Sequence, residues 1–322
     1  MEAEHLKRYL KLRQMVVLDT VLRERSLLKA AEVLSLTQPA ITKTIQAMEE
    51  ALGVELVERT ARGIQPTVFG DAVHARLKNI FAEIRLLGDD LAGLAEGNRG
   101  HVVVGTLISA AAWLLPMAIT RLNQAGGSIV VTIQEGTNDQ LMPQLVTGEI
   151  DLVVGRIPYG VYPGVRHQRL YSETLCAVAR VGHPEVDRRR TSMSRLGGYP
   201  WIIPIVETPV RTTVERLFRE AGLALPANRI ESLSILTNVN VLRRSDAICL
   251  LPSAVADHYV REGMLAMLPM TLSETFGEVG ISEATEREPT PAALALATAL
   301  RQAAAERARE DDDPDGSYYP AE

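Results

Sequence analysis

Three polar side chains near the start of one helical segment have the types and spacing needed to read DNA bases. The segment LTQPAITKTIQAMEEALG, residues 36–53, presents Gln38, Thr42 and Lys43 beside an apolar stripe. A Gln amide can pair with adenine, Lys can bind guanine or phosphate, and Thr can bind a base or a phosphate. Pro39 lies in the first turn, where its missing N–H costs nothing and its fixed φ preorganises the helix. The pattern predicts a recognition helix.

The elements that must position these side chains form a small helical unit. An amphipathic helix is predicted to end near Arg25, Ser26 then caps a short helix, and Thr37 caps the next one. In that third helix, apolar residues repeat at spacings of 4, 3 and 4, which indicates a buried face: Ile41, Ile45, Met48 and Leu52. Two helices joined by a short turn indicate a helix-turn-helix, and a three-helix unit used only for packing is the alternative.

A basic hairpin is predicted directly after this unit. The segment VELVERTARGIQPT consists of two short extended runs around Arg62 and Gly63. A helix-turn-helix followed by such a hairpin is a winged helix. Its tip would bring Arg59 and Arg62 to the phosphate backbone or the minor groove.

A long helix is predicted from about Thr67 to Ala95. Its apolar residues alternate spacings of 4 and 3, which favours a coiled-coil seam and therefore a dimer, and packing on its own domain is the alternative. The segment EGNRG, Glu96 to Gly100, is predicted to be a hinge. The predicted seam consists of Val73, Leu77, Ile80, Ile84, Leu87, Leu91 and Leu94.

From His101 the periodicity changes to short apolar runs separated by helical segments. The runs are HVVVGT, SIVVTIQ, IDLVVG, WIIP, AICLLP and FGEVGIS. Continuous apolar runs of this length are typical of buried parallel strands in βαβ units. An Ala-rich helix from Pro291 to Ala305 is expected to close the domain. Two similar α/β halves predict a ligand cleft at their junction.

Composition bounds the remaining possibilities. The net charge is −6, but the C-terminal segment from Glu310 carries six acidic residues and no basic one, leaving 34 basic and 34 acidic residues in the body of the chain. DNA contact must therefore come from a local patch. Cys176 and Cys249 have no metal-ligand spacing and are expected to be buried thiols, and no metal site is predicted. The N-terminus lacks the apolar core of a signal peptide, which favours a cytoplasmic location.

The run AAEVLSLTQPAITKTIQAMEEALGVELVERTARGIQPTVFG, residues 30–70, resembles the LysR-type transcriptional regulators. The family signature is a double alanine, Gln-Pro-Ala, a Ser/Thr plus basic pair, a Leu-Glu-x-x-Leu-Gly segment and a Phe-x-Arg wing, and this run follows it with two departures. Met48 stands where Leu is usual and Val57 where Phe is usual, and both are apolar replacements. The segments DLVVGRIP and LYSETLCAVARVGHP are similar to the branch that contains the protocatechuate-operon activator and the galactose-binding-protein regulator.

The resemblance implies an α/β fold class. An N-terminal winged helix-turn-helix is followed by a long linker helix and an effector domain of two subdomains like those of periplasmic binding proteins. The implied boundaries are 1–66 for the DNA-binding domain, 67–98 for the linker helix and hinge, 99–306 for the effector domain, and 307–322 for an acidic tail that is predicted to be disordered. A homodimer or homotetramer is expected.

The resemblance also assigns roles by position in the motif. Gln38, Pro39, Thr42 and Lys43 match the recognition helix, and Arg59 matches the wing.

In the effector domain, ligand contacts of the family lie at helix starts after strands, and the corresponding positions here are Ser109, Thr137 and Arg156. Hydroxyls beside a helix start suit a carboxylate or a sugar hydroxyl, and Arg adds charge. The alternative for Ser109 and Thr137 is plain helix capping.

The predicted function is regulation of transcription in response to a small effector, either an aromatic-derived acid or a sugar. Promoter DNA, the effector and RNA polymerase are the expected partners, and no cofactor is expected. An enzyme with an appended regulatory winged helix is the alternative, but G-x-S-x-G, a P-loop and a G-x-G-x-x-G after a strand are all absent from the sequence. A solute-binding protein is disfavoured by the DNA-binding module.

Overall fold

The computed structural model describes residues 10–61, 63–96, 99–124, 126, 128–205, 208–270, 272 and 276–312. The chain forms two compact units that divide near Ala92. Each unit has hydrophobic cores of its own, and each is described by itself below.

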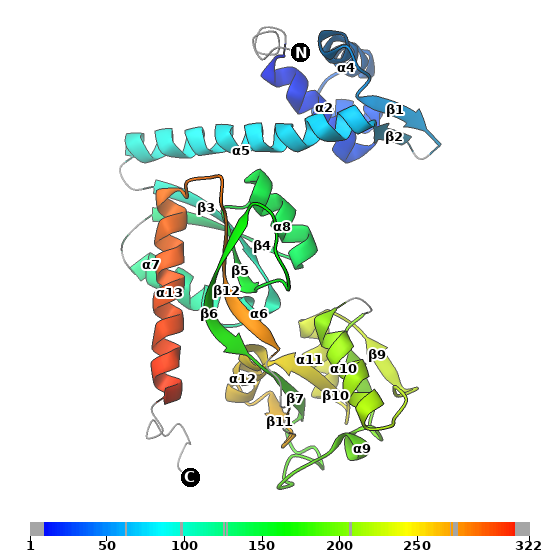
Figure 1. The fold of residues 1–322 in the computed structure, drawn as a ribbon, viewed down its shortest axis with the longest axis vertical. Coiled ribbons are helices and arrows are strands. Elements are labelled where there is room, and N and C mark those ends of the chain that lie inside the picture. Colours follow the sequence, from blue (N-terminus) through cyan, green and yellow to red (C-terminus); the bar gives the residue numbers. More distant parts are fainter. Residues whose placement is uncertain are drawn as a thin grey trace. The chain divides into compact units, whose positions relative to one another are not determined.

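The N-terminal unit is a helix-turn-helix followed by a hairpin and a long helix (Figure 1). Its core consists of residues from all of these elements, including the predicted stripe of the third helix. The elements are α2 (Leu12–Glu24), α3 (Leu27–Val33), α4 (Gln38–Leu52), β1 (Val57–Thr60), β2 (Gly63–Pro66) and α5 (Val68–Glu96).

Capping residues set the helix bounds in this unit as the sequence predicts. The Ser26 hydroxyl accepts from the backbone N–H of Lys29 at 3.3 Å, and the Thr37 hydroxyl accepts from Ala40 at 3.4 Å. Gly53 ends α4 in the left-handed region with φ 70°. The helix, turn and hairpin predictions for this unit are confirmed.

The C-terminal unit contains two five-stranded sheets with helices on their faces (Figure 1). The first has the order β4-β3-β5-β12-β6, in which β3, β4 and β5 are parallel and β12 is antiparallel to β5 and β6. Its strands are β3 (Arg99–Thr106), β4 (Ser128–Glu135), β5 (Leu152–Arg156), β6 (Val165–Glu173) and β12 (Gly277–Ala284). Its helices are α6 (Ile108–Ala111), α7 (Leu114–Gln124), α8 (Asn138–Thr147) and α13 (Pro291–Asp312).

The second sheet has the order β11-β7-β10-β8-β9, with β10, β8 and β9 parallel. Its strands are β7 (Leu175–Arg180), β8 (Trp201–Ile203), β9 (Arg229–Glu231), β10 (Ile248–Pro252) and β11 (Leu265–Met267). Its helices are α9 (Met193–Leu196), α10 (Pro209–Glu220), α11 (Ile235–Leu242) and α12 (Ser253–Arg261). The two sheets define a first and a second subdomain.

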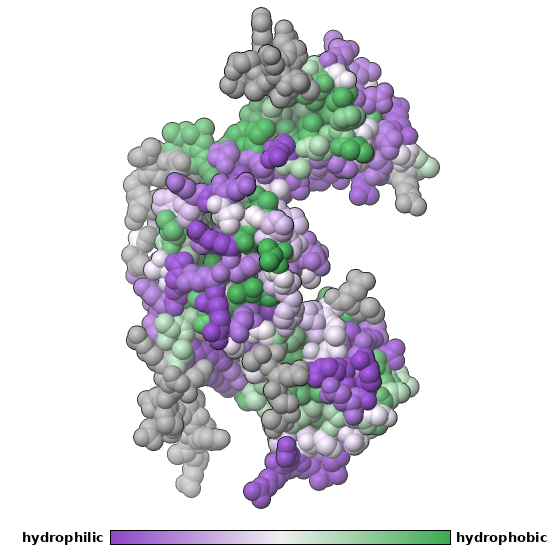
Figure 2. Space-filling view, in the orientation of Figure 1, coloured by the Kyte–Doolittle hydropathy of each residue, from purple (hydrophilic) through white to green (hydrophobic). Residues whose placement is uncertain are grey.

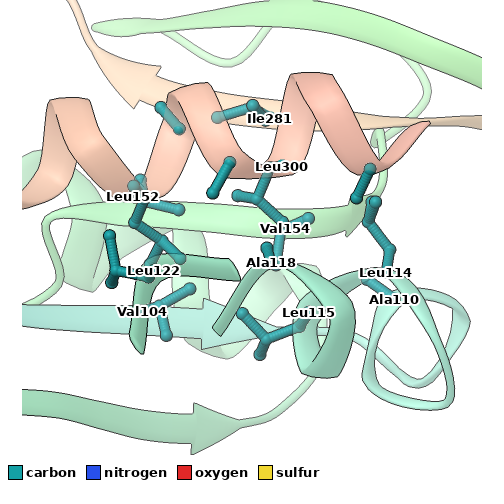
Figure 3. Close-up of a cluster of buried hydrophobic side chains, with 14 of the residues drawn as sticks. Val104, Ala110, Leu114, Leu115, Ala118, Leu122, Leu152, Val154, Ile281 and Leu300 are labelled. Atoms are coloured by element: carbon teal, nitrogen blue, oxygen red, sulfur yellow. The ribbon is translucent and has the colours of Figure 1, made fainter. Parts of the chain in front are cut away.

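Alternating side chains of the first sheet build a separate core on each of its faces. Val104, Leu152 and Val154 pack with α7 and α13 (Figure 3), whereas Val103 and Val153 pack with α8 on the opposite face. Strands covered on both faces explain the continuous apolar runs in the sequence.

The structure corrects several expectations for this unit. The sheets are mixed instead of purely parallel, and the sequence interpretation missed β6, β7, β9 and β11. The strand β4 is an edge strand and is not fully buried, because 63% of Val130 and 53% of Ile133 are exposed. The final helix continues past Ala305 to Asp312, so the implied domain end at residue 306 falls inside α13.

The predicted hinge lies only partly among the described residues. Gly97 and Asn98 are outside them, and Arg99 and Gly100 already belong to β3. Residues 313–322 of the predicted acidic tail are also outside them.

Candidate DNA-binding surface and effector site

The recognition helix α4 is held by its buried stripe and presents the predicted polar residues on its other side. Ile41 and Met48 are fully buried. Gln38 and Lys43 are exposed, and Thr42 is half-buried. Pro39 occupies the first turn of α4, as predicted. The helix therefore offers amide, hydroxyl and ammonium groups to a groove, the chemistry that distinguishes base edges.

The turn between α3 and α4 fixes the angle of the recognition helix. Ser35 adopts the left-handed conformation with φ 53°, and the Leu36 backbone N–H donates to the Ala31 carbonyl at 2.9 Å. Ala30 and Ala31 are buried, so α3 can pack closely against its neighbours. A rigid turn of this kind is what a helix-turn-helix needs to place its second helix in a groove.

The hairpin is tied to the end of the recognition helix by one carboxylate. Glu49 accepts from the backbone N–H of Leu56 at 2.7 Å and of Val57 at 3.3 Å. The exposed Arg59 lies on β1, opposite Ile64 of β2. Arg62, the other predicted wing residue, lies outside the described residues. The Glu49 contacts give the hairpin a defined position relative to α4, as a wing requires.

The predicted effector residues follow three neighbouring parallel strands. Thr106 at the end of β3 lies opposite Glu135 of β4 and Val154 of β5, so the carboxyl ends of the three strands share one edge. Ser109, Thr137 and Arg156 follow or end these strands at that edge. This edge of an open α/β sheet is where ligands bind.

The surroundings of the two hydroxyls differ. Ser109 is only 2% exposed and lies inside α6, whose cap position is Leu107, so plain capping does not explain Ser109. Thr137 is exposed and directly precedes α8, and its backbone N–H donates to the Gln140 side chain at 3.1 Å. Of the two residues, only Thr137 has a position that helix capping alone could explain.

Arg156 is held between aromatic rings and is largely withdrawn from water. Its guanidinium carbon lies 5.0 Å from the ring centre of Phe276 and 5.4 Å from that of Tyr159. Burial lowers the pKa of Arg156 from its usual value. The Asn138 side chain donates to the Arg156 carbonyl at 3.1 Å and so joins the start of α8 to the end of β5.

Glu173, the last residue of β6, is a site residue that the sequence interpretation missed. Its side chain is fully buried where the chain passes from the first subdomain into the second. Burial raises the pKa of the Glu173 carboxyl, and the Ser109 hydroxyl and the Ala254 backbone N–H act in the opposite direction. The two groups lie near the carboxyl, but neither carboxylate oxygen makes a well-formed hydrogen bond. The carboxyl is thus adjacent to Ser109 of one subdomain and to the start of α12 in the other.

A second polar cluster links α13 to the second subdomain. Arg307 donates to Asp257 of α12 at 2.6 Å, and its guanidinium carbon lies 4.7 Å from a ring centre of Trp113. Trp113 also meets Tyr171 edge to face, with ring centres 6.1 Å apart. This contact exists because α13 extends beyond its predicted end.

The two cysteines are free thiols in β7 and β10. Cys249 is buried and Cys176 is half-buried, and burial raises their pKa values to about 12 and about 11. Both thiols are therefore protonated at neutral pH, which makes them poor nucleophiles.

Known proteins resemble this chain along nearly its whole length. Residues 12–71 match the bacterial regulatory helix-turn-helix protein, lysR family, and residues 95–305 match the LysR substrate binding domain. The HTH-type transcriptional regulator PcaQ of Agrobacterium fabrum is 32% identical over 299 residues, which cover 92% of this chain and 96% of the relative.

The chain belongs to the LysR family of transcriptional regulators.

Further relatives agree with this assignment. The HTH-type transcriptional regulator GbpR of Azospirillum brasilense is 30% identical over 300 residues, covering 92% of this chain and 88% of the relative. Among solved structures, the LysR family regulator CbnR has the same fold, with a TM-score of 0.67 at 20% identity and coverage of 92% of this chain and 99% of that one. CbnR in complex with its target DNA gives a TM-score of 0.66 at 21% identity, covering 91% of this chain and 100% of that one.

The regulator binds promoter DNA and a small-molecule effector and acts as an oligomer, and its relatives are transcriptional regulators and not enzymes. Among its described residues, no helix combines the length and apolar character needed to cross a membrane. No group of three His, Cys, Asp or Glu residues in that part of the chain could hold a metal ion.

The linker helix α5 of the regulator divides the predicted seam into two parts. Val73 and Leu77 pack into the core of the N-terminal unit. Farther along the helix the apolar residues are exposed to 38–58%, and Figure 2 shows hydrophobic side chains gathered along α5. These exposed residues are Ile80, Ile84, Leu87 and Leu91. The side chain of Leu94, the last residue of the predicted seam, lies outside the described part of the structure. The exposed part is the section of α5 that a partner helix can cover.

Replacing Gln38 or Lys43 with Ala is expected to weaken binding to a cognate promoter fragment without lowering thermal stability, because both side chains are exposed. A lost bidentate base contact costs about 1–3 kcal/mol, which raises Kd roughly 5- to 150-fold. Mobility-shift titrations at one salt concentration measure the change. The matched control is Glu50→Ala, an exposed position near the other end of α4. Parent-level binding by both Ala variants would place base recognition on another element.

Proposed function

We propose that the regulator binds promoter DNA through Gln38, Thr42, Lys43 and the wing residues Arg59 and Arg62, and that it responds to an effector held at the carboxyl edge of β3, β4 and β5. The main support for this effector site is that Ser109, Thr137 and Arg156 all lie at this one edge of the sheet. Arg156 also has a buried guanidinium nitrogen, Nη1, without a hydrogen-bond partner. Because the chain matches a bacterial promoter-binding family, we place the regulator in the cytoplasm, with RNA polymerase as the expected further partner.

The arrangement of the subdomains supports a response to the effector. The chain leaves the first sheet after Glu173 of β6 and returns to it at β12. A ligand between subdomains joined in this way contacts both of them, so it can favour one relative arrangement over another. Only such a difference in affinity lets a ligand shift the regulator between states.

The test is a Ser109→Ala/Thr137→Ala double variant. Loss of the Thr137 hydroxyl should cost about 1 kcal/mol of folding free energy at most, and loss of the buried Ser109 hydroxyl beside Glu173 about 1–3 kcal/mol. The variant should therefore keep its fold and its basal DNA binding. It should lose the change in DNase footprint that the parent shows with an activating member of a panel of hydroxybenzoates and free sugars, because ligand hydrogen bonds are removed. The matched control is Thr298→Ala, an exposed hydroxyl position on α13. An unchanged footprint response in the double variant would move the effector site away from this edge.

A further inference from the structure

Buried polar atoms without hydrogen-bond partners gather where β5 and β6 end and β12 begins. They are Arg156 Nη1, the Tyr171 hydroxyl and both carboxylate oxygens of Glu173. Arg156 pairs with Val279 of β12, and Val279 pairs with Tyr171 of β6, so these side chains belong to one row on one face of the sheet. Native proteins rarely leave buried polar groups unpaired, so such groups in one place are where a bound water, ion or ligand supplies the missing partners.

A glycine lets the arginine approach the acid. Gly277 of β12 lies opposite Glu173, and a Cβ on Gly277 would lie 3.3 Å from Arg156 Cδ. The φ of Gly277 is 144°, a conformation that other residues rarely adopt. The Arg156 side chain therefore passes over Gly277 toward Glu173. Arg156 and Glu173 nevertheless form no ion pair with each other. Arg156 Nη1 and both carboxylate oxygens of Glu173 all lack a hydrogen-bond partner.

The second subdomain supplies an apolar surface at the matching edge of its own sheet. The strands β8, β9 and β10 are parallel, so the residues that follow them share one edge. Ala254, whose N–H approaches Glu173, follows β10. Ile205 follows β8 and is 45% exposed, and Leu233 and Leu236 follow β9 and are 48% and 75% exposed. Exposed aliphatic side chains at such an edge suit the apolar body of a ligand.

We infer that the effector is a hydroxylated ring carboxylate, with its carboxylate on Arg156, a hydroxyl donating to Glu173, and its ring against the aliphatic edge of the second sheet. This inference rests on the proposed effector site. A carboxylate alone leaves Glu173 unpaired beside a second negative charge, and a neutral sugar leaves Arg156 without an anion. Only a ligand that carries both groups satisfies the guanidinium and the carboxylate together. Because Ser109 and Ala254 cover Glu173 from different subdomains, separation of the two subdomains gives the ligand access.

The test is a calorimetric titration of the full-length protein with a matched ligand series. The probes are benzoate, 4-hydroxybenzoate, 3,4-dihydroxybenzoate, 4-methylcatechol, galactonate and galactose. A hydroxylated benzoate is expected to bind at least about tenfold more tightly than benzoate and 4-methylcatechol, since a site built to hydrogen-bond a hydroxyl discriminates strongly against an analogue without it. Galactonate separates the ring requirement from the hydroxy-acid requirement and should bind more weakly than the hydroxybenzoates.

Two variants assign the two contacts. Glu173→Met should reduce the preference for hydroxybenzoates over benzoate to less than about threefold. Arg156→Met should likewise reduce the preference for hydroxybenzoates over 4-methylcatechol to less than about threefold. Glu173→Gln, which keeps the size and one acceptor oxygen, should retain part of the first preference and serves if Glu173→Met does not fold. Thr298→Ala should retain both preferences.

The outcomes separate this inference from the proposed function. Equal or tighter binding of benzoate, galactonate or galactose, or no binding by any probe, overturns the hydroxylated ring carboxylate. If one of those other compounds binds and alters the footprint, the proposed function stands without this inference. If 3,4-dihydroxybenzoate binds as expected and leaves the footprint unchanged, the ligand class stands and the proposed response fails.

Discussion

Replacing Ile84 with Glu is expected to convert the full-length oligomer into a species of lower mass. Ile84 is 41% exposed in the middle of the apolar part of α5, which a partner helix can cover. An unpaired charge buried in an interface costs about 3–5 kcal/mol, and about 1.4 kcal/mol changes an affinity tenfold. The dissociation constant of the dimer should therefore rise by two orders of magnitude or more. Sedimentation velocity at micromolar concentration measures the mass.

The control for this substitution is Ala75→Glu, which places the same charge at an exposed position of α5 outside the apolar stripe. This variant should sediment like the parent protein. An Ile84→Glu protein with the mass of the parent would show that the interface runs elsewhere. The edge strand β4, with its exposed Val130 and Ile133, would then be the next surface to test.

The N-terminal unit could be predicted from the sequence because its signals are local. Caps such as Thr37 and Gly53, and a stripe with helical spacing, determine each helix within a few turns of chain. The split of the linker stripe could not be predicted in the same way. Val73 and Leu77 look like Ile80 and Ile84 in the sequence, and only the position of the helical core decides which of them it covers.

The residues of the effector site that directly follow strands could be predicted from the sequence. The residue whose position depends on pairing between distant segments could not. Ser109, Thr137 and Arg156 follow or end strands that consecutive βαβ units bring together. The strand β6 is rich in polar residues and pairs with β12, more than 100 residues later in the chain, so no local pattern identifies it. Glu173 looks like a solvent-exposed acid in the sequence. Its burial results from the packing of α6 and α12 around the end of β6.

One continuous set of contacts joins the recognition helix to the linker helix inside the N-terminal unit. The Glu49 carboxylate holds the backbone of Leu56 and Val57. The Thr67 hydroxyl donates to the Glu55 carbonyl at 2.6 Å and accepts from the Gly70 N–H at 3.0 Å. The first turn of α5 is thus fastened to the segment that the end of α4 positions. A change at this joint should alter both stability and DNA binding.

Replacing Gly70 with Ala is expected to have the largest effect on stability at this joint. A Cβ on Gly70 would lie 1.9 Å from the backbone carbonyl oxygen of Leu56, so the backbone itself must move. Overpacking of this kind costs about 2–3 kcal/mol, which lowers the Tm of a unit of this size by roughly 10 °C or more.

Gly88→Ala is the matched control in the same helix, because apart from the helix's own backbone nothing lies within 4 Å of its Cβ position. This change should stabilise α5 by roughly 0.5–1 kcal/mol, the ordinary advantage of Ala over Gly in a helix. Scanning calorimetry of both variants measures the difference, and mobility shift measures the accompanying loss of promoter affinity in Gly70→Ala. A Gly70→Ala protein as stable as Gly88→Ala would mean that α5 does not approach Leu56 closely. The wing and the linker helix would then be free to move independently of each other.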